Sequence, residues 1–405
     1  MKKLFVYFYI LGLIPVALVG LQAQNTANFE LGNGLNFSLN DGAYQFKIGG
    51  MIQPSLNLEM MNSAKPDYYF NVKRSFFNIS GTALKEKVSF LLQTDFSLGS
   101  PLLDAWVAYM PLKDLNIAFG QKQSIANNRE MLIMEDKFQF ADRSLLSTEL
   151  SGSGREFGLF ISQKIALKNI GLVPQVAVTS GDGRNSFGID SRDSDKGGLK
   201  YSGRIDLYPL GFFTAGNGDL IADLEHEKKL KLVVGGAASY NDGASSSVGE
   251  GHGDFQLYDA NGTPKFPDYR KFYGDILVKY RGFSFLGELA MTSATSLNGS
   301  YTVASNSSPL VPTQISQYLA LGTAFNTQLG YVTKSGYALD LRYDALMPEF
   351  GNNVNSIIKE TTGMTIGLSK YFKHNNLKLQ TSFSSFSYGD NTSQLSGSFL
   401  VQLVF

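Results

Sequence analysis

The chain has 405 residues with 35 basic and 35 acidic side chains and no cysteine. This balance argues against a nucleic-acid-binding protein, and the absence of cysteine excludes disulfides and a lipid-modified cysteine. The mean hydropathy is -0.07, and the chain contains 42 Gly, 20 Tyr and 30 Phe. Because no run after residue 24 is apolar and long enough to cross a membrane as a helix, this composition favours a closed barrel with an apolar belt and a polar lumen.

The first residues have the pattern of a secretory signal peptide. Met1-Lys-Lys precedes an apolar run over residues 4–21, and Ala23 is a small residue suited to cleavage. An uncleaved membrane anchor is the alternative, but no basic cluster follows the run. We therefore expect a signal peptide at 1–23, an N-terminal periplasmic lead segment at 24–43 and a transmembrane barrel at 44–405.

Sixteen segments of the mature chain alternate between apolar and polar residues, as half-buried strands do. In residues 337–346, Tyr337, Leu339, Leu341 and Tyr343 share one face, and the polar residues between them share the other. The segments are residues 44–60, 72–83, 88–97, 102–111, 115–123, 155–164, 171–180, 200–208, 230–241, 272–280, 283–292, 317–332, 337–346, 361–372, 377–388 and 392–405.

The lengths of the connections support this count. Bacterial barrels begin and end in the periplasm, with short turns there and longer loops outside. Connections after even-numbered segments are short, except residues 209–229, and those after odd-numbered segments include long polar loops. We therefore predict an all-β, transmembrane antiparallel β-barrel of 16 strands.

The last segment ends on Phe405, and an aromatic C-terminal residue is typical of bacterial outer-membrane barrels. Alternation alone would also fit a soluble or surface-displayed β protein. The signal peptide, the terminal Phe405 and the loop pattern favour the outer membrane of a Gram-negative cell, so outer-membrane lipid is an expected partner.

Several short motifs resemble the phosphate-selective porin O and P family, in a Bacteroidetes-type form. They comprise a strand with Arg74 and Gly81, a segment ending on Asp95-Phe96, and Asp104-Ala105 followed by Tyr109. Further landmarks are Gly120-Gln-Lys122, Asn128-Arg-Glu130, Asp142-Arg-Ser144 and Arg155-Glu-Phe-Gly158. The resemblance implies a homotrimeric, sixteen-stranded porin whose third outer loop folds into the lumen and sets the constriction.

Residues 124–154 form the third outer loop by position and are the longest connection. The loop mixes charged residues with an apolar set, which suits packing against an inner wall. An external lid over the barrel mouth is the alternative.

Charged side chains on the inner face are the candidate site residues, because pore selectivity depends on charges at a narrow point. Guanidinium groups suit phosphate and carboxylate oxygens. The carboxylates on the same face could instead neutralise them and leave a general pore. The expected pore-lining or constriction residues are Arg74, Lys122, Arg129, Arg143, Arg155, Arg204, Lys279, Arg342, Asp95, Asp104, Glu288 and Asp340.

The sequence thus predicts an outer-membrane porin for passive diffusion of small hydrophilic solutes and ions. A preference for small anions or phosphate is the narrower version of this hypothesis. The alternatives are a closed-lumen scaffold or adhesion barrel, or a barrel enzyme.

No catalytic residue, cofactor or metal is expected. The three histidines, His226, His252 and His374, fall in connections, away from the strand positions that a Ser–His pair in the wall would need. Asp190, Asp193 and Asp195 lack the full calcium-loop signature.

Overall fold

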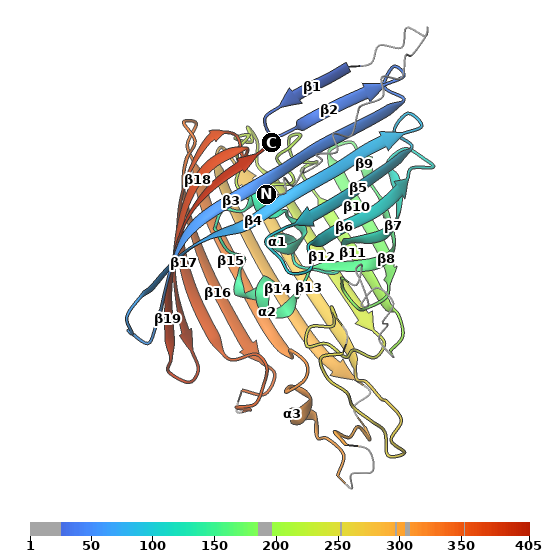
Figure 1. Ribbon diagram of the computed structural model, residues 1–405, viewed down its shortest axis with the longest axis vertical. Coiled ribbons are helices and arrows are strands. Elements are labelled where there is room, and N and C mark those ends of the chain that lie inside the picture. Colours follow the sequence, from blue (N-terminus) through green and yellow to red (C-terminus); the bar gives the residue numbers. More distant parts are fainter. Residues whose placement is uncertain (1–25, 185–196, 252, 296–297, 304–307, 352) are drawn as a thin grey trace, which may run out of the picture.

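The computed structural model describes residues 26–184, 197–251, 253–295, 298–303, 308–351 and 353–405. The predicted signal peptide, His252 and the acidic residues at 190–195 lie outside this part. The described chain forms a closed antiparallel β-barrel (Figure 1). Its strands, in chain order, are β1 (Thr26–Glu30), β2 (Gly34–Leu39), β3 (Tyr44–Met61), β4 (Asp67–Ala83), β5 (Val88–Asp95), β6 (Leu102–Tyr109), β7 (Leu115–Gln123), β8 (Arg155–Gln163), β9 (Ile165–Leu167), β10 (Ile170–Thr179), β11 (Lys200–Tyr208), β12 (Lys231–Asn241), β13 (Asp268–Tyr280), β14 (Phe283–Thr295), β15 (Gly322–Val332), β16 (Tyr337–Pro348), β17 (Thr361–Lys373), β18 (Leu377–Tyr388) and β19 (Ser393–Val404).

The barrel closes where β19 pairs with β3 in antiparallel register. At the end of this seam, Phe405 and Gly50 exchange backbone hydrogen bonds of 2.9 and 2.7 Å. Strands β8 and β9 both pair with β10 and occupy one barrel position, so β3 to β19 supply sixteen positions. The predicted sixteen-stranded antiparallel barrel is confirmed.

The two faces of each strand differ as the alternation predicted. On β16, Tyr337, Leu339, Leu341 and Tyr343 are exposed on the outside, whereas the intervening Asp340, Arg342 and Asp344 are buried on the inside. An apolar outer face suits contact with lipid, and the closure of β19 on β3 leaves the described sheet of the wall without a free edge.

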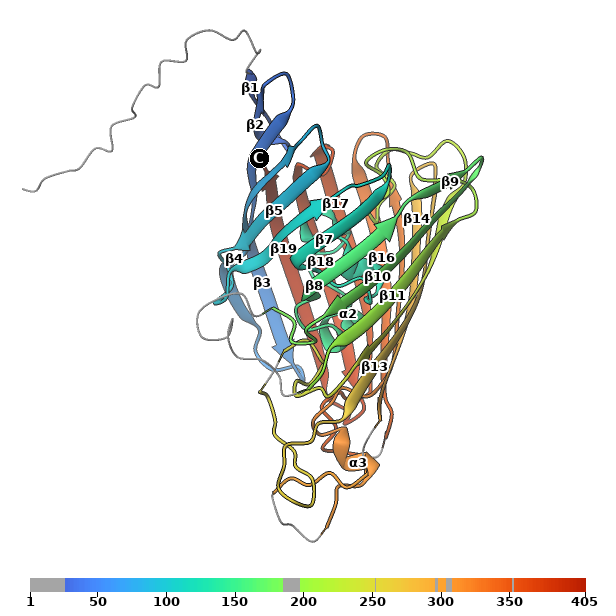
Figure 2. The ribbon, with the colours of Figure 1, turned by 90° about the vertical axis from the view of Figure 1, so that its right-hand side faces the viewer.

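The short turns gather at the end of the barrel that carries the chain's C-terminus, and the long loops extend from the other end (Figures 1 and 2). The long-loop end includes α3 (Pro312–Ile315). Following the rule for bacterial barrels, we assign the short-turn end to the periplasm.

The hairpin of β1 and β2 extends the wall at the periplasmic end. Strand β2 pairs with β3 from Leu35↔Ile48 to Leu39↔Tyr44, where β19 has already ended. Figure 2 shows the hairpin projecting beyond the barrel rim. The segment expected to lead into the barrel is therefore itself a β-hairpin.

Several predicted strand boundaries were wrong. Residues 317–321 are outside β15, because Leu319 and Leu321 are buried with Ile315 in an apolar cluster of the outer loops. The predicted segment 155–164 ends earlier, at Gln163, and β9 follows it as a separate short strand. Strands β4 and β13 begin earlier than predicted, at Asp67 and Asp268.

Among the described residues, the helices are all too short or too polar to span a membrane.

The turn between β13 and β14 provides a test of the fold. Arg281 and Gly282 have φ of 49° and 92°, as a two-residue type I′ hairpin requires, and a Cβ on Gly282 would lie 2.4 Å from the Val332 carbonyl oxygen. We expect Gly282→Ala to lower the free energy of unfolding by about 1–3 kcal/mol. Chemical denaturation should show this loss. Gly274→Ala is the control, because a Cβ there meets nothing within 4 Å; equal effects of the two substitutions would contradict the prediction.

Candidate pore constriction

The third outer loop, L3 (residues 124–154), folds into the lumen. It carries α1 (Arg129–Leu132), the 3-10 turn η1 (Glu135–Lys137) and α2 (Leu145–Leu150). Figures 1 and 2 both show α2 enclosed by the strands of the barrel. The predicted inward loop is therefore present, and the alternative of an external lid is wrong.

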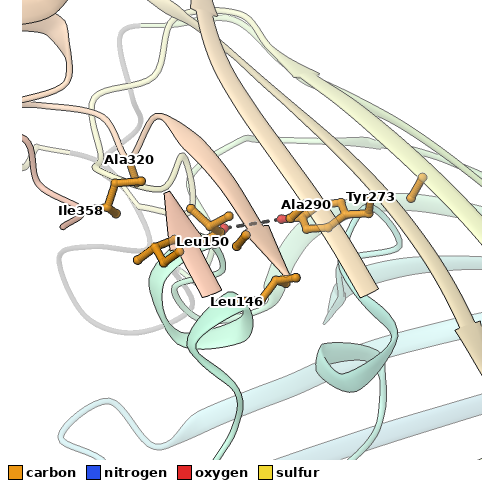
Figure 3. Close-up of a cluster of buried hydrophobic side chains, with 9 residues drawn as sticks. Leu146, Leu150, Tyr273, Ala290, Ala320 and Ile358 are labelled. Atoms are coloured by element: carbon orange, nitrogen blue, oxygen red, sulfur yellow. Dashed lines mark hydrogen bonds between the residues drawn. The ribbon is translucent and has the colours of Figure 1, made fainter. Parts of the chain in front are cut away.

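Helix α2 packs on an apolar part of the inner wall (Figure 3). Its Leu146 and Leu150 are buried in a cluster with Tyr273 of β13, Ala290 of β14 and Ala324 of β15. The hydroxyl of Tyr273 also donates to the Leu150 carbonyl at 3.4 Å. Alanine at inward positions leaves the space that a helix needs, so this side of the lumen is filled by protein.

A buried quartet of charges fixes α1 to the wall. Arg129 contacts Asp206 of β11 and Asp275 of β13, each at 2.6 Å, and Arg204 of β11 contacts the same carboxylates at 2.9 and 2.6 Å. None of the four side chains is more than 8% exposed. Gly235 provides the room, because a Cβ there would lie within 2.6 Å of three of these side chains. The quartet contains two positive and two negative charges, so it is an internal neutral anchor.

Two carboxylates, of Glu288 and Glu130, also hold α1 and the segment before α2 in place. Glu288 of β14 accepts a hydrogen bond from the backbone N–H of Glu130 at 2.7 Å. The carboxylate of Glu130 accepts from the hydroxyls of Ser144 and Ser147, each at 2.6 Å, and from the amide of Gln328 on β15 at 2.7 Å. These contacts hold both ends of L3 against β14 and β15.

The middle of L3 is tied to the opposite part of the wall. The ammonium group of Lys378 on β18 donates to the Phe138 carbonyl at 2.8 Å, and the amide of Gln402 on β19 donates to the Asp136 carbonyl at 2.9 Å. L3 therefore crosses the lumen and is hydrogen-bonded from β11 round to β19.

The long periplasmic connection, residues 209–229, folds back into the barrel on the periplasmic side of L3. The ammonium group of Lys279 on β13 donates to the carbonyls of Asn217, Leu220 and Ala222 at 2.5, 2.8 and 3.0 Å. Ile221 is buried in one apolar cluster with Phe138 of L3. This connection, which is longer than the barrel pattern predicts, thus packs against L3 from the periplasmic side.

A recess of about 330 Å³ remains between L3 and the wall formed by β4 to β8. We call it the constriction pocket. Apolar side chains such as Phe76, Leu103 and Met131 contribute to its lining. Its charged lining residues are five basic side chains, Lys73, Arg74, Arg143, Arg155 and Arg184, and two carboxylates, Asp95 and Glu135.

Ion pairs neutralise part of this charge. Arg143 pairs with Glu135, Arg155 pairs with Asp104 at 3.1 Å, and Lys73 pairs with Asp142 at 2.6 Å. Burial alone would raise the pKa of Glu135, but the guanidinium groups of Arg143, Arg155 and Arg74 lower it to about 2. Glu135 is therefore ionised throughout the physiological range.

Arg74 differs from these paired cations. It donates to Gln53 Oε1 at 2.8 Å and to the Ala141 carbonyl at 3.2 Å, and it forms no ion pair in the described part of the chain. The pocket thus keeps a basic excess that the neutral quartet lacks.

Lys73 is a lining residue that the strand pattern missed. Strict alternation puts Lys73 and Arg74 on opposite faces of β4. A bulge opposite Gln53 and Pro54 changes the register, and Lys73 reaches Asp142 of L3 inside the barrel. Pro54 in the partner strand was the available signal, since proline in a sheet is often found at a bulge. For Arg184, in the next outer loop, alternation offered no signal.

The structure places the predicted site residues in two groups. Arg74, Arg143, Arg155 and Asp95 line the constriction pocket, and Asp104 lies behind it as the partner of Arg155.

The other predicted residues are inside the barrel but outside the pocket. Arg342 donates to the Asp142 carbonyl at 2.8 Å, and Asp340 accepts from Gln139 at 2.7 Å. Lys122 lies 5.2 Å from the ring centroid of Trp106 on the inner wall. The remaining members, Arg129, Arg204, Lys279 and Glu288, hold L3 or the periplasmic connection as described above.

No protein-family model matches the sequence, and no curated protein matches it. Solved structures do resemble the fold. Vibrio cholerae OmpT, an outer membrane protein in its trimer form, is 10% identical with a TM-score of 0.51, over 89% of this chain and 99% of that chain. Pseudomonas putida OprB is 12% identical with a TM-score of 0.51, over 90% and 95%. Salmonella typhi OmpF in complex with daunomycin is 11% identical with a TM-score of 0.50, over 89% and 98%.

The closed sixteen-stranded wall, the apolar outer face and these likenesses define a transmembrane β-barrel with the fold of outer-membrane porins. At such low identity the likeness concerns the fold.

The charge quartet gives the second prediction. Arg129→Met leaves two buried carboxylates with one guanidinium, so we expect a loss of about 3–5 kcal/mol in the free energy of unfolding. Trp106, the single tryptophan, lies on the inner wall and can report unfolding by its fluorescence in denaturant. The double variant Arg129→Met, Asp206→Asn restores the charge balance and should recover part of the loss. A single variant as stable as the natural protein would contradict the anchoring role.

Proposed function

We propose that this barrel is a diffusion channel for small hydrophilic solutes and ions, with a modest preference for anions. The observation that carries the proposal is the constriction pocket, where five basic side chains face two carboxylates beside L3. Charge at the narrowest point of a pore governs which ions enter it.

The proposed path follows the wall of β4 to β6. On the other side, α2, the quartet and the periplasmic connection fill the lumen. A second recess of about 530 Å³ lies toward the periplasmic ends of the same strands, where Ser80, Leu91 and Trp106 are among its lining residues. The two recesses, one on each side of Asn78 and Gln93 along these strands, support a route past L3.

The degree of selectivity follows from the pairing inside the pocket. Arg74 has no ion pair in the described part of the chain, and its guanidinium suits phosphate and carboxylate oxygens. Glu135 and Asp95 oppose it in the same pocket. We therefore propose a general anion preference. We also propose membership of the phosphate-selective porin O and P family, on the resemblance of the motifs around Arg74, Asp104 and Arg155.

We propose a channel in preference to an enzyme because the described histidines, His226 and His374, lie in periplasmic connections away from the pocket.

We also propose that residues 1–23 are a signal peptide and that residues 24–43 lie in the periplasm. The alternative function, a closed scaffold barrel, is favoured by the extent to which L3 fills the lumen.

Conductance in a planar lipid bilayer tests the channel. Under a KCl gradient, we expect a reversal potential on the anion-selective side. Arg74→Gln should lower the chloride-to-potassium permeability ratio by roughly half, because it removes a cation of the pocket that no ion pair in the described part of the chain neutralises.

The control is Lys113→Gln, which changes an exposed lysine in a periplasmic turn outside the pocket. No conductance from the folded protein would favour the scaffold. If Arg74→Gln conducts with unchanged selectivity, the ions pass through the barrel by a path outside the constriction pocket.

We further propose a homotrimer, on the resemblance to the porin family and the trimer form described for Vibrio cholerae OmpT. Native mass spectrometry of the detergent-solubilised barrel should give three times the mass of the mature chain. A monomer at concentrations where the barrel is folded would overturn this proposal.

A further inference from the structure

The outer face of the barrel carries a groove of about 460 Å³ at the periplasmic ends of β15 to β18. The end of the groove nearest the turns carries Thr333, Tyr337 and Lys370, and Lys370 pairs across the sheet with Tyr337 and Leu379. The other end, farther from the turns, is formed mainly by Leu339 and Leu368, with Tyr331 and Thr381 beside them. The groove therefore suits an amphipathic molecule better than a uniformly apolar one.

The cation at the polar end has a defined position. The Lys370 ammonium group lies 3.9 Å from the ring centroid of Tyr337 and 5.6 Å from that of Phe372, and it donates to the Ser335 carbonyl at 2.5 Å. An ammonium group has three donors, so further acceptors can be bound. Lys334 in the adjoining turn and Lys373 at the end of β17 are both exposed, and none of the groove's lining residues is acidic.

Aromatic side chains mark the depth of this end in the membrane. The rings of Phe283 and Tyr331 have centroids 4.4 Å apart, and Arg281 lies 5.0 Å from the ring centroid of the neighbouring Tyr280. Aromatic girdles of outer-membrane barrels lie at the level of the lipid headgroups, where long basic side chains also reach the interface. The polar end of the groove is thus at the headgroup level of the inner leaflet, and its apolar end is in the hydrocarbon layer.

We propose that this groove binds an anionic phospholipid of the periplasmic leaflet. The phosphate lies at Lys370, with Lys334 and Lys373 nearby, and the acyl chains cover Leu339 and Leu368. Charge complementarity favours an anionic occupant, because Lys370 is the one charged residue among those that line the groove. The proposal is independent of whether the lumen conducts.

A diffuse attraction of lipid to the whole rim has to be distinguished from this site. Other short periplasmic turns also carry basic residues, for example Lys87 between β4 and β5 and Arg281 between β13 and β14. Lys87 is therefore a matched control: it is an exposed turn lysine that does not line the groove.

Native mass spectrometry of the full, folded chain in detergent tests the site. Phosphatidylglycerol and phosphatidylcholine with identical acyl chains are added at equal concentrations, and the bound adducts are counted. We expect phosphatidylglycerol adducts to exceed phosphatidylcholine adducts, and Lys370→Gln to weaken phosphatidylglycerol binding by roughly fivefold. Lys87→Gln should leave it unchanged. Heat-modifiability on gels verifies that each variant is folded.

A second substitution tests the apolar end. Leu368→Trp fills the groove with a side chain that lipid-facing strands tolerate, so it should lower the binding of both lipids. The proposal is overturned by equal binding of the two lipids, by equal effects of the lysine substitutions, or by unchanged binding in both Lys370→Gln and Leu368→Trp. Preferential binding of lipopolysaccharide in the same assay would also overturn it, because that lipid belongs to the outer leaflet.

Discussion

The structure depends on one constraint: inside a bilayer, every backbone N–H and C=O must find its partner within the protein. The pairing of β19 with β3, completed by the Phe405–Gly50 hydrogen bonds, meets this constraint by leaving the sheet without a free edge in the membrane. Closure also divides the side chains strictly into those that face lipid and those that face the lumen. Both candidate sites, the constriction pocket inside and the lipid groove outside, follow from that division.

A polar lumen creates a second problem, because charges that leave water must be paired. The quartet around Arg129, the hydrogen bonds to Glu130 and the carbonyls around Lys279 solve it by joining wall residues to inward segments. The same contacts fill most of the lumen with L3 and the periplasmic connection. Pairing that stabilises the fold therefore also decides where space remains, which is beside Arg74 and the wall of β4 to β8.

The two sites use the same chemistry on opposite faces of the wall. In the proposed channel, Arg74 and its basic neighbours in the constriction pocket would donate hydrogen bonds to hydrated anions, and the carboxylates in the same pocket would weaken that attraction. In the outer groove, Lys370 is held by Tyr337 and the Ser335 carbonyl, with no acidic lining residue. A pore needs binding weak enough for release, whereas a lipid site gains from an unopposed charge.

The sequence by itself determined the barrel, its strand count, the inward or outward direction of residues such as Leu339 and Arg342, and the place of residues 124–154 as the third outer loop. These follow from a period of two and from connection lengths, which are local properties of the chain. Only the tertiary structure decided which charged side chains in the lumen are neutralised by an ion pair. Arg129 and Asp275 are 146 residues apart in sequence, and Lys73 reaches the lumen through a bulge opposite Pro54. Charge pairing and bulge geometry depend on contacts across the barrel, so alternation along one strand carries no record of them.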